Sequence, residues 1–152
     1  MPSWIMRGEL GYSLDANVLL HASNLRSPWH REATEFLKKC TEADEILWLA
    51  WPTVMAYLRI STHPSIFSTP LHPAEAEENI GTLLGLPQVR LLSEDHRFWW
   101  TYRSVTSEST ARGNLVPDTH LAALLLCHGV KTLYTKDRDF QRFGFLEVRE
   151  PF

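Results

Sequence analysis

The chain has 152 residues, of which 44% are hydrophobic and 22% charged, a balance typical of one soluble globular domain rather than of a disordered or fibrous chain. Its formal net charge of -3 argues against a protein that holds nucleic acid through a broad basic face. No apolar run approaches the roughly 20 residues needed to span a bilayer, and the first residues show no secretory pattern, so we expect no membrane association and a cytoplasmic protein.

Short apolar runs alternate with amphipathic segments in the first half of the chain. In chain order we expect an N-terminal arm over 1–10, a strand over 11–14, a helix over 16–23, a helix over 28–40, a strand over 46–50 and a helix over 52–61. Ser27 is predicted to cap the second helix, with Pro28 at its first helical position. The run over 46–50 is continuously apolar, which is the pattern of a strand covered on both faces.

The second half of the chain continues the alternation. After a Pro- and Ser-rich loop we expect a helix over 73–86, a strand over 89–92, helices over 95–111 and 117–128, a strand over 130–135, a helical turn over 139–143 and an edge strand over 146–149. Gly129 is predicted to stop the helix before it. This order of elements is typical of a three-layer α/β/α sandwich around a mainly parallel sheet of four to five strands, in a single domain over 1–152.

A cluster of aromatic residues lies in the expected helix over 95–111, at Phe98, Trp99, Trp100 and Tyr102. Core packing, a dimer surface and a platform for stacking bases are all compatible with it. We favour core or dimer packing, because aromatic residues are enriched at interfaces and a stacking platform needs a basic groove beside it.

Four of the six aspartates fall where a strand is expected to end or a helix to begin: Asp15, Asp118, Asp137 and Asp139. Taken singly, an aspartate at such a place is more often a helix cap or a turn residue than a ligand. A parallel α/β sheet, however, gathers these ends in one crevice. Converging carboxylates raise one another's pKa unless a cation lies between them, and oxygen ligands suit Mg²⁺ or Mn²⁺. The expected chemistry is metal-assisted hydrolysis of a phosphodiester, which a net negative charge does not exclude.

Three stretches, in this order, resemble the motifs of PIN-domain ribonucleases: Leu-Asp-Ala-Asn-Val-Leu-Leu over 14–20, Val-Pro-Asp-Thr-His-Leu-Ala-Ala over 116–123 and Thr-Lys-Asp-Arg-Asp-Phe over 135–140. They resemble more closely the VapC-type toxins of type II toxin–antitoxin pairs. The resemblance implies a metal-dependent endoribonuclease that acts on RNA as a toxin, with a cognate VapB-type antitoxin and a second copy of the chain as partners. It also implies that the first strand lies beside the fourth.

Site residues carried over from the resemblance fall into two groups. Asp15, Asp118 and Asp137 would be catalytic metal ligands, and Asn17, Thr135 and Asp139 would support them, with Asp139 as an alternative or indirect ligand. The family usually carries a glutamate on the helix after the second strand, where this chain has Ala56. Whether one or two metal ions bind is therefore open, and a non-catalytic PIN-like module that binds RNA or protein is the alternative. A different aspartate-dependent phosphotransfer domain fits less well, since no Asp-x-Asp follows the first strand.

Basic side chains near the acidic motifs are candidates for contacts with RNA phosphates. These are Lys136, Arg138 and Arg142, for which a solvated surface charge is the alternative. His120 lies two residues after Asp118 and is a candidate for positioning the scissile phosphate, with a surface or capping histidine as the more common case.

Overall fold

The computed structural model describes residues 11–152, so the predicted arm over 1–10 lies outside the described residues. The elements are, in order, β1 (Tyr12–Leu14), α2 (Ala16–Ser23), α3 (His30–Glu42), β2 (Leu47–Ala50), α4 (Trp51–Ser61), α5 (Pro73–Leu84), β3 (Val89–Leu92), α6 (Phe98–Glu108), α7 (Leu115–Cys127), β4 (Thr132–Tyr134), the 3-10 helix η1 (Arg138–Arg142) and β5 (Glu147–Arg149). Among these elements, no helix is long and apolar enough to cross a membrane.

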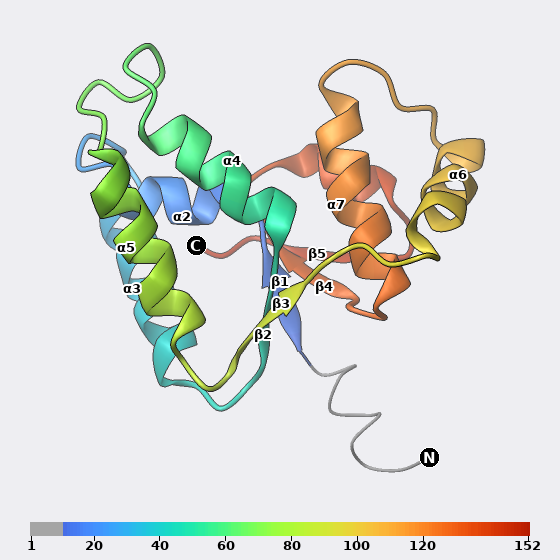
Figure 1. Cartoon of the computed structure of the whole chain (residues 1–152), viewed down its shortest axis with the longest axis horizontal. Coiled ribbons are helices and arrows are strands. Elements are labelled where there is room, and N and C mark those ends of the chain that lie inside the picture. Colours follow the sequence, from blue (N-terminus) through green and yellow to red (C-terminus); the bar gives the residue numbers. More distant parts are fainter. Residues whose placement is uncertain (1–10) are drawn as a thin grey trace.

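One sheet of five parallel strands, in the order β3-β2-β1-β4-β5, runs through the middle of the fold (Figure 1). Helices α2, α3, α4 and α5 lie on one side of the sheet, and α6 and α7 lie on the other (Figure 1). The predicted α/β/α sandwich is therefore confirmed, as is the placement of the first strand beside the fourth. In the register of that pair, Leu14 lies opposite Tyr134.

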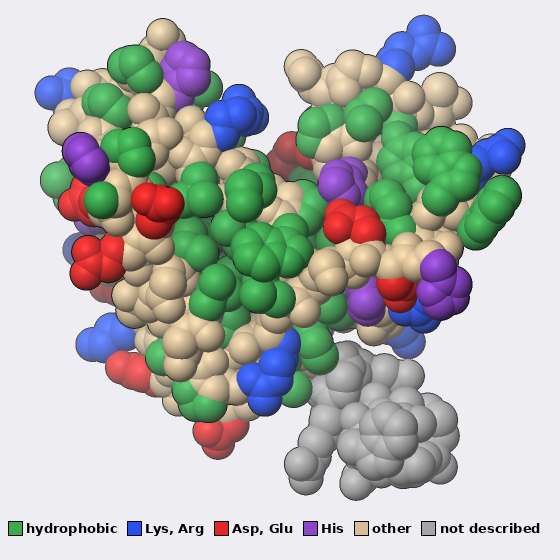
Figure 2. Space-filling model, in the orientation of Figure 1, with side chains coloured by type: hydrophobic (Ala, Val, Ile, Leu, Met, Phe, Trp, Pro, Cys, Tyr) green, Lys and Arg blue, Asp and Glu red, His purple; other side chains and the backbone are tan. Residues whose placement is uncertain are grey.

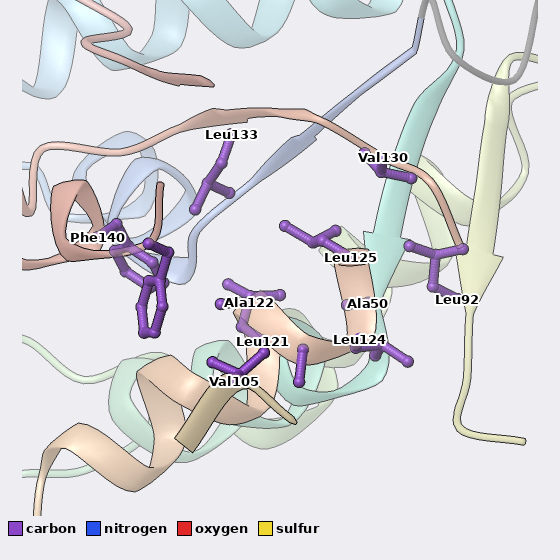
Figure 3. Close-up of a cluster of buried hydrophobic side chains, with 12 residues drawn as sticks. Ala50, Leu92, Val105, Leu121, Ala122, Leu124, Leu125, Val130, Leu133 and Phe140 are labelled. Carbon is purple, nitrogen blue, oxygen red and sulfur yellow. The ribbon is translucent and has the colours of Figure 1, made fainter. Parts of the chain in front are cut away.

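Each face of the sheet carries its own hydrophobic core. On the first face, Leu14, Leu47 and Leu49 pack with apolar residues of α2, α4 and α5. On the second face, four buried residues of α7 (Leu121, Ala122, Leu124 and Leu125) pack with Leu133, Val130 and Phe140 (Figure 3). Because both faces are covered, the interior strand β2 (Leu-Trp-Leu-Ala) is a continuous apolar run rather than an alternating one.

Helix α7 begins two residues before its predicted start. Pro117 lies in its first turn, where a missing N–H costs nothing because that group has no partner within the helix. Asp118 is therefore the fourth residue of the helix rather than the second. At the other end, Gly129 has φ +71° and its N–H donates to the carbonyl of Leu126, so the predicted stop at Gly129 is confirmed.

Two helices begin later in the chain than the sequence predicts. The Ser27 hydroxyl accepts a hydrogen bond from the N–H of Trp29 at 3.1 Å, and the Ser27 carbonyl accepts one from His30, which closes a separate turn before α3. Ser27 is therefore not a helix cap. In the same way, the carboxylate of Asp95 accepts from the N–H of Arg97 at 2.8 Å, and α6 begins only at Phe98.

The aromatic cluster of α6 divides between the core and the surface. Phe98 and Tyr102 pack against the second core. Trp99 and Trp100 are 57% and 67% exposed. The core interpretation is wrong for these two tryptophans, and the dimer interpretation stays a prediction for them.

Candidate active site

A cavity of about 310 Å³ lies at the carboxyl end of the sheet, between α4 and α7. Figure 2 shows a hollow at the top centre, between the part of the molecule that carries α4 and the part that carries α7. The floor is formed by residues that follow β1 and β4, including Asp15, Asn17 and Asp137, and one wall carries Asp118. The four residues come from three separate segments, so the fold brings together what the sequence predicted to converge.

Hydrogen bonds hold both the backbone and the side chain of Asp15. Its N–H donates to the carbonyl of Tyr134 at 3.1 Å, which ties the end of β1 to the end of β4. Its carboxylate accepts three hydrogen bonds: from the N–H of Ala16 at 2.7 Å, from the Thr135 hydroxyl at 2.9 Å and from Asn17 Nδ2 at 3.2 Å. Burial raises the pKa of Asp15 above its ordinary value, and these hydrogen bonds act in the opposite direction.

Thr135 joins the two halves of the site. Its side chain is buried, and its hydroxyl donates to Asp15 while it accepts from Asn17 Nδ2 at 3.0 Å and from the N–H of Asp137 at 2.9 Å. The carboxylate of Asp137 in turn accepts from the N–H of Asp139 at 2.9 Å and caps η1. Asn17 and Thr135 thus contact the residues that the sequence predicted them to support.

Asp118 differs from Asp15 and Asp137 because its carboxylate accepts no hydrogen bond from any residue in the range 11–152. Its pKa is raised to about 6, first by burial and then by the negative charges of Asp137, Asp15 and Asp139. A role as helix cap or turn former therefore does not account for Asp118.

Oxygen atoms of Asp118, Asp137 and Asp139 lie within 4.8 Å of one another. The Asp15 carboxylate lies outside this group but lines the same cavity. Mutually repelling carboxylate oxygens at this spacing fit a divalent cation such as Mg²⁺ or Mn²⁺, because an ion between them relieves the repulsion that raises the Asp118 pKa. Asp139, expected as a supporting residue, belongs to this group, although it does not line the cavity.

The walls of the cavity include three residues to which the motifs did not assign a firm role. Ala56 and Arg59 lie on α4, and His120 lies on α7. His120 Nε2 lies 2.5 Å from a carboxylate oxygen of Glu94. Burial raises the pKa of Glu94, but the hydrogen bond to His120, a backbone hydrogen bond and the charges of His120 and His128 together outweigh it, so the pKa is lowered overall. No sequence signal pointed to Glu94, which is 26 residues away along the chain.

Two of the three basic side chains that are candidates for contacts with RNA phosphates instead contact other groups of the protein. Lys136 Nζ donates to the carbonyl of Phe152 at 3.1 Å and lies over the ring of Trp29, 4.9 Å from its centre. The guanidinium of Arg142 donates to the hydroxyl of Ser109 at 2.8 Å and to the carbonyl of the next residue. Arg138 is exposed and does not line the cavity.

Comparison with protein families agrees with this geometry. A family model described as "PIN domain" matches residues 12–146. The chain therefore belongs to the PIN-domain family.

Relatives narrow this assignment to one branch of the family. The chain is 40% identical to Ribonuclease VapC48 of Mycobacterium tuberculosis over 140 residues, which cover 92% of this chain and 97% of the relative. It is 31% identical to VapC ribonuclease Mb2897 of Mycobacterium bovis over 138 residues, which cover 91% of this chain and 93% of the relative. The resemblance to VapC-type ribonucleases is confirmed.

Solved structures share the fold at low sequence identity. VapC20 of M. tuberculosis, described as a Sarcin-Ricin loop cleaving toxin, superposes with a TM-score of 0.68 at 16% identity and covers 91% of this chain and 99% of its own. VapBC2 of Rickettsia felis, solved with a DNA fragment from its promoter, gives a TM-score of 0.65 at 14% identity, with 91% and 97% of the two chains covered.

Proposed function

We propose that this chain is a divalent-metal-dependent endoribonuclease that hydrolyses RNA phosphodiester bonds as the toxin of a type II toxin–antitoxin pair. The observation that carries the proposal is the Asp118 carboxylate, which has no hydrogen-bond partner among the described residues and faces Asp137 and Asp139. The names of the VapC relatives support the reaction class.

Each acidic residue has a distinct part in the proposal. Asp118 and Asp137 hold a Mg²⁺ or Mn²⁺ ion, together with Asp15 or Asp139. When bound, such an ion makes a water more acidic and stabilises the negative charge that develops on the phosphate. Asp118, free of other partners, orients the attacking water. Hydrogen bonds with Asn17 and Thr135 hold Asp15 and Asp137 in position.

The partners follow from the relatives and belong to the same proposal. Solved structures with this fold include toxin–antitoxin complexes bound to DNA, which supports a VapB-type antitoxin as partner. We further propose a homodimer, for which the exposed Trp99 and Trp100 are candidate contacts, and a cytoplasmic location.

The alternative function is a PIN-like module that binds RNA or protein without cleaving it. The observation that favours it is Ala56, whose methyl group lines the cavity where the family usually places a carboxylate. This alternative predicts no specific binding of divalent cations, since a binding module does not need an ion between its aspartates.

Cleavage of single-stranded RNA, with Mn²⁺ either added or chelated, separates the two functions. We compare the wild type with Asp118→Asn and with the control Asp44→Asn, which removes an exposed carboxylate outside the cavity. We expect Mn²⁺-dependent cleavage by the wild type and the control, and a loss of at least a hundredfold in Asp118→Asn. Equal rates for all three proteins, or cleavage that persists in chelator, would contradict the proposed function. If no RNA is cleaved, calorimetric titration with Mn²⁺ distinguishes a binding module, which binds no divalent cation specifically, from an enzyme whose RNA substrate was not among those tested.

A further inference from the structure

Arg59 is the one Lys or Arg residue that lines the acidic cavity within the described part of the chain. Its side chain is exposed, and its guanidinium makes neither a hydrogen bond nor an ion pair with any of residues 11–152. The neighbouring cations Lys136 and Arg142 are both held by protein groups, as described above. Arg59 is therefore a free cation at the edge of the proposed active site.

Arg59 also forms no ion pair with any aspartate or glutamate among the described residues. Its charge is therefore available for an anion bound in the cavity that it lines.

The path from the cluster to Arg59 runs along one face of α4. Thr53, Ala56 and Arg59 are spaced three residues apart and all line the cavity. Thr53 lies near the floor, where its hydroxyl donates to the carbonyl of Leu14 at 3.3 Å, next to Asp15. Arg59 is six residues further on, about 9 Å along the helix at 1.5 Å per residue. Between them Ala56 contributes only a methyl group to the cavity wall.

An RNA strand presents one phosphate per nucleotide, so a strand with one phosphate at the carboxylate cluster offers another further along. We propose that Arg59 binds the phosphate next to the scissile one, and that the small side chain at Ala56 leaves room for the nucleotide between them. The guanidinium suits this task, since its fork of donors matches two phosphate oxygens at once. His120 on the opposite wall is paired with Glu94. This inference rests on the proposed function for the position of the scissile phosphate.

Binding of single-stranded RNA tests the inference without relying on cleavage. Fluorescence anisotropy is measured in the Asp118→Asn background, with Arg59 intact or replaced in Arg59→Ala and Arg59→Lys. Arg103→Ala, which removes an exposed arginine of α6 outside the cavity, is the control. We expect Arg59→Ala to weaken binding about tenfold, as for the loss of one charge-assisted hydrogen-bonded contact. The slope of log K against log salt should fall by about 0.7, the value for one phosphate of a single strand. Arg59→Lys should retain the slope and lose part of the affinity.

Equal affinity and equal salt slope in Arg59→Ala and Arg103→Ala would overturn the inference. If the wild type cleaves no RNA and the Arg59-dependent binding is present, the proposed function fails and the phosphate contact stands. If the wild type cleaves RNA and Arg59→Ala binds as tightly as the control, the phosphate contact fails and the proposed function stands.

The position of the contacted phosphate is tested with an oligonucleotide that the wild type cuts at one site. One phosphate next to the scissile one is replaced by an uncharged methylphosphonate, on each side in turn. At one of the two positions we expect the replacement to raise the wild-type KM about tenfold with little change in kcat, and to leave the KM of Arg59→Ala unchanged. An equal rise in KM for both proteins at both positions would show that Arg59 does not contact either neighbouring phosphate.

Discussion

Asp118→Asn is expected to stabilise the protein against unfolding when no divalent cation is present. The carboxylate has no hydrogen bond to lose among the described residues, and its pKa is raised from 3.8 to about 6 by burial and by three neighbouring aspartates. At 1.36 kcal/mol per pKa unit, the full shift corresponds to about 3 kcal/mol of destabilisation by the charged form. Because the carboxylate is partly exposed and solvent screens the repulsion, we expect a gain of about 1 to 1.5 kcal/mol. For a chain of this length that is a rise in Tm of roughly 3 to 5 °C.

The pH dependence of this gain has a definite sign. The folded-state pKa of Asp118 lies above its unfolded value, so the folded protein binds more protons between pH 3.8 and about 6, and its stability falls as pH rises through that window. The advantage of Asp118→Asn over the wild type is therefore largest above pH 6 and disappears as pH falls toward 3.8. Added Mn²⁺ should reverse the order, because the ion stabilises the protein that binds it more tightly.

Urea unfolding in chelator, at pH 7.5 and pH 4.5, measures the gain. Asp44→Asn, at an exposed site outside the cavity, is the control and should lie within about 0.5 kcal/mol of the wild type at both values. If Asp118→Asn is no more stable than Asp44→Asn at pH 7.5, the carboxylates do not repel one another strongly, and the argument for a cation between them loses its electrostatic basis.

Three further substitutions probe the scaffold and the wall of the site. Thr135→Val removes the buried hydroxyl that hydrogen-bonds to Asp15 and to the N–H of Asp137. Urea unfolding should show that the free energy of unfolding falls by about 1 to 3 kcal/mol. Thr135→Ser keeps the hydroxyl and should retain most of the stability. Ala56→Glu adds a carboxylate to the cavity wall and should tighten Mn²⁺ binding several-fold by calorimetry, whereas unchanged affinity would show that the wall lies too far from the ion. Gly129→Ala places a Cβ at φ +71°, where open space surrounds it, so only backbone strain of about 1 kcal/mol should appear in thermal unfolding.

The sequence predicts the fold well where apolar pattern and position along the chain agree. The continuous apolar run 46–50 predicts a strand covered on both faces, and β2 lies in the interior of the parallel sheet. Gly129 predicts the end of a helix, and its positive φ provides it. Asp15 and Asp137 lie at the ends of neighbouring strands, which the pairing of β1 with β4 brings together.

Other features depend on contacts that are distant in sequence or on competing local hydrogen bonds. Ser27 and Asp95 each accept a hydrogen bond from the N–H group two residues later and close a turn, although both residues are also favoured as helix caps. Arg59 carries no motif that marks it as a phosphate ligand. Its position beside the site is apparent only from the structure, in which α4 forms a wall of the cavity and Lys136 donates to the carbonyl of Phe152.

The cap and ligand interpretations of the aspartates are not exclusive. The number of hydrogen bonds that each carboxylate accepts shows which interpretation applies to which residue. An ionised carboxylate offers about four lone-pair sites. Asp15 uses three of them, on Ala16, Asn17 and Thr135, so it is mainly an anchor with one site left for an ion. Asp118 uses none on the described residues, and its pKa is raised to about 6 by burial and by its acidic neighbours. A bound cation would therefore meet Asp118 as a carboxylate with all of its lone-pair sites open, while Asp15 and Thr135 fix the geometry in which Asp137 meets it.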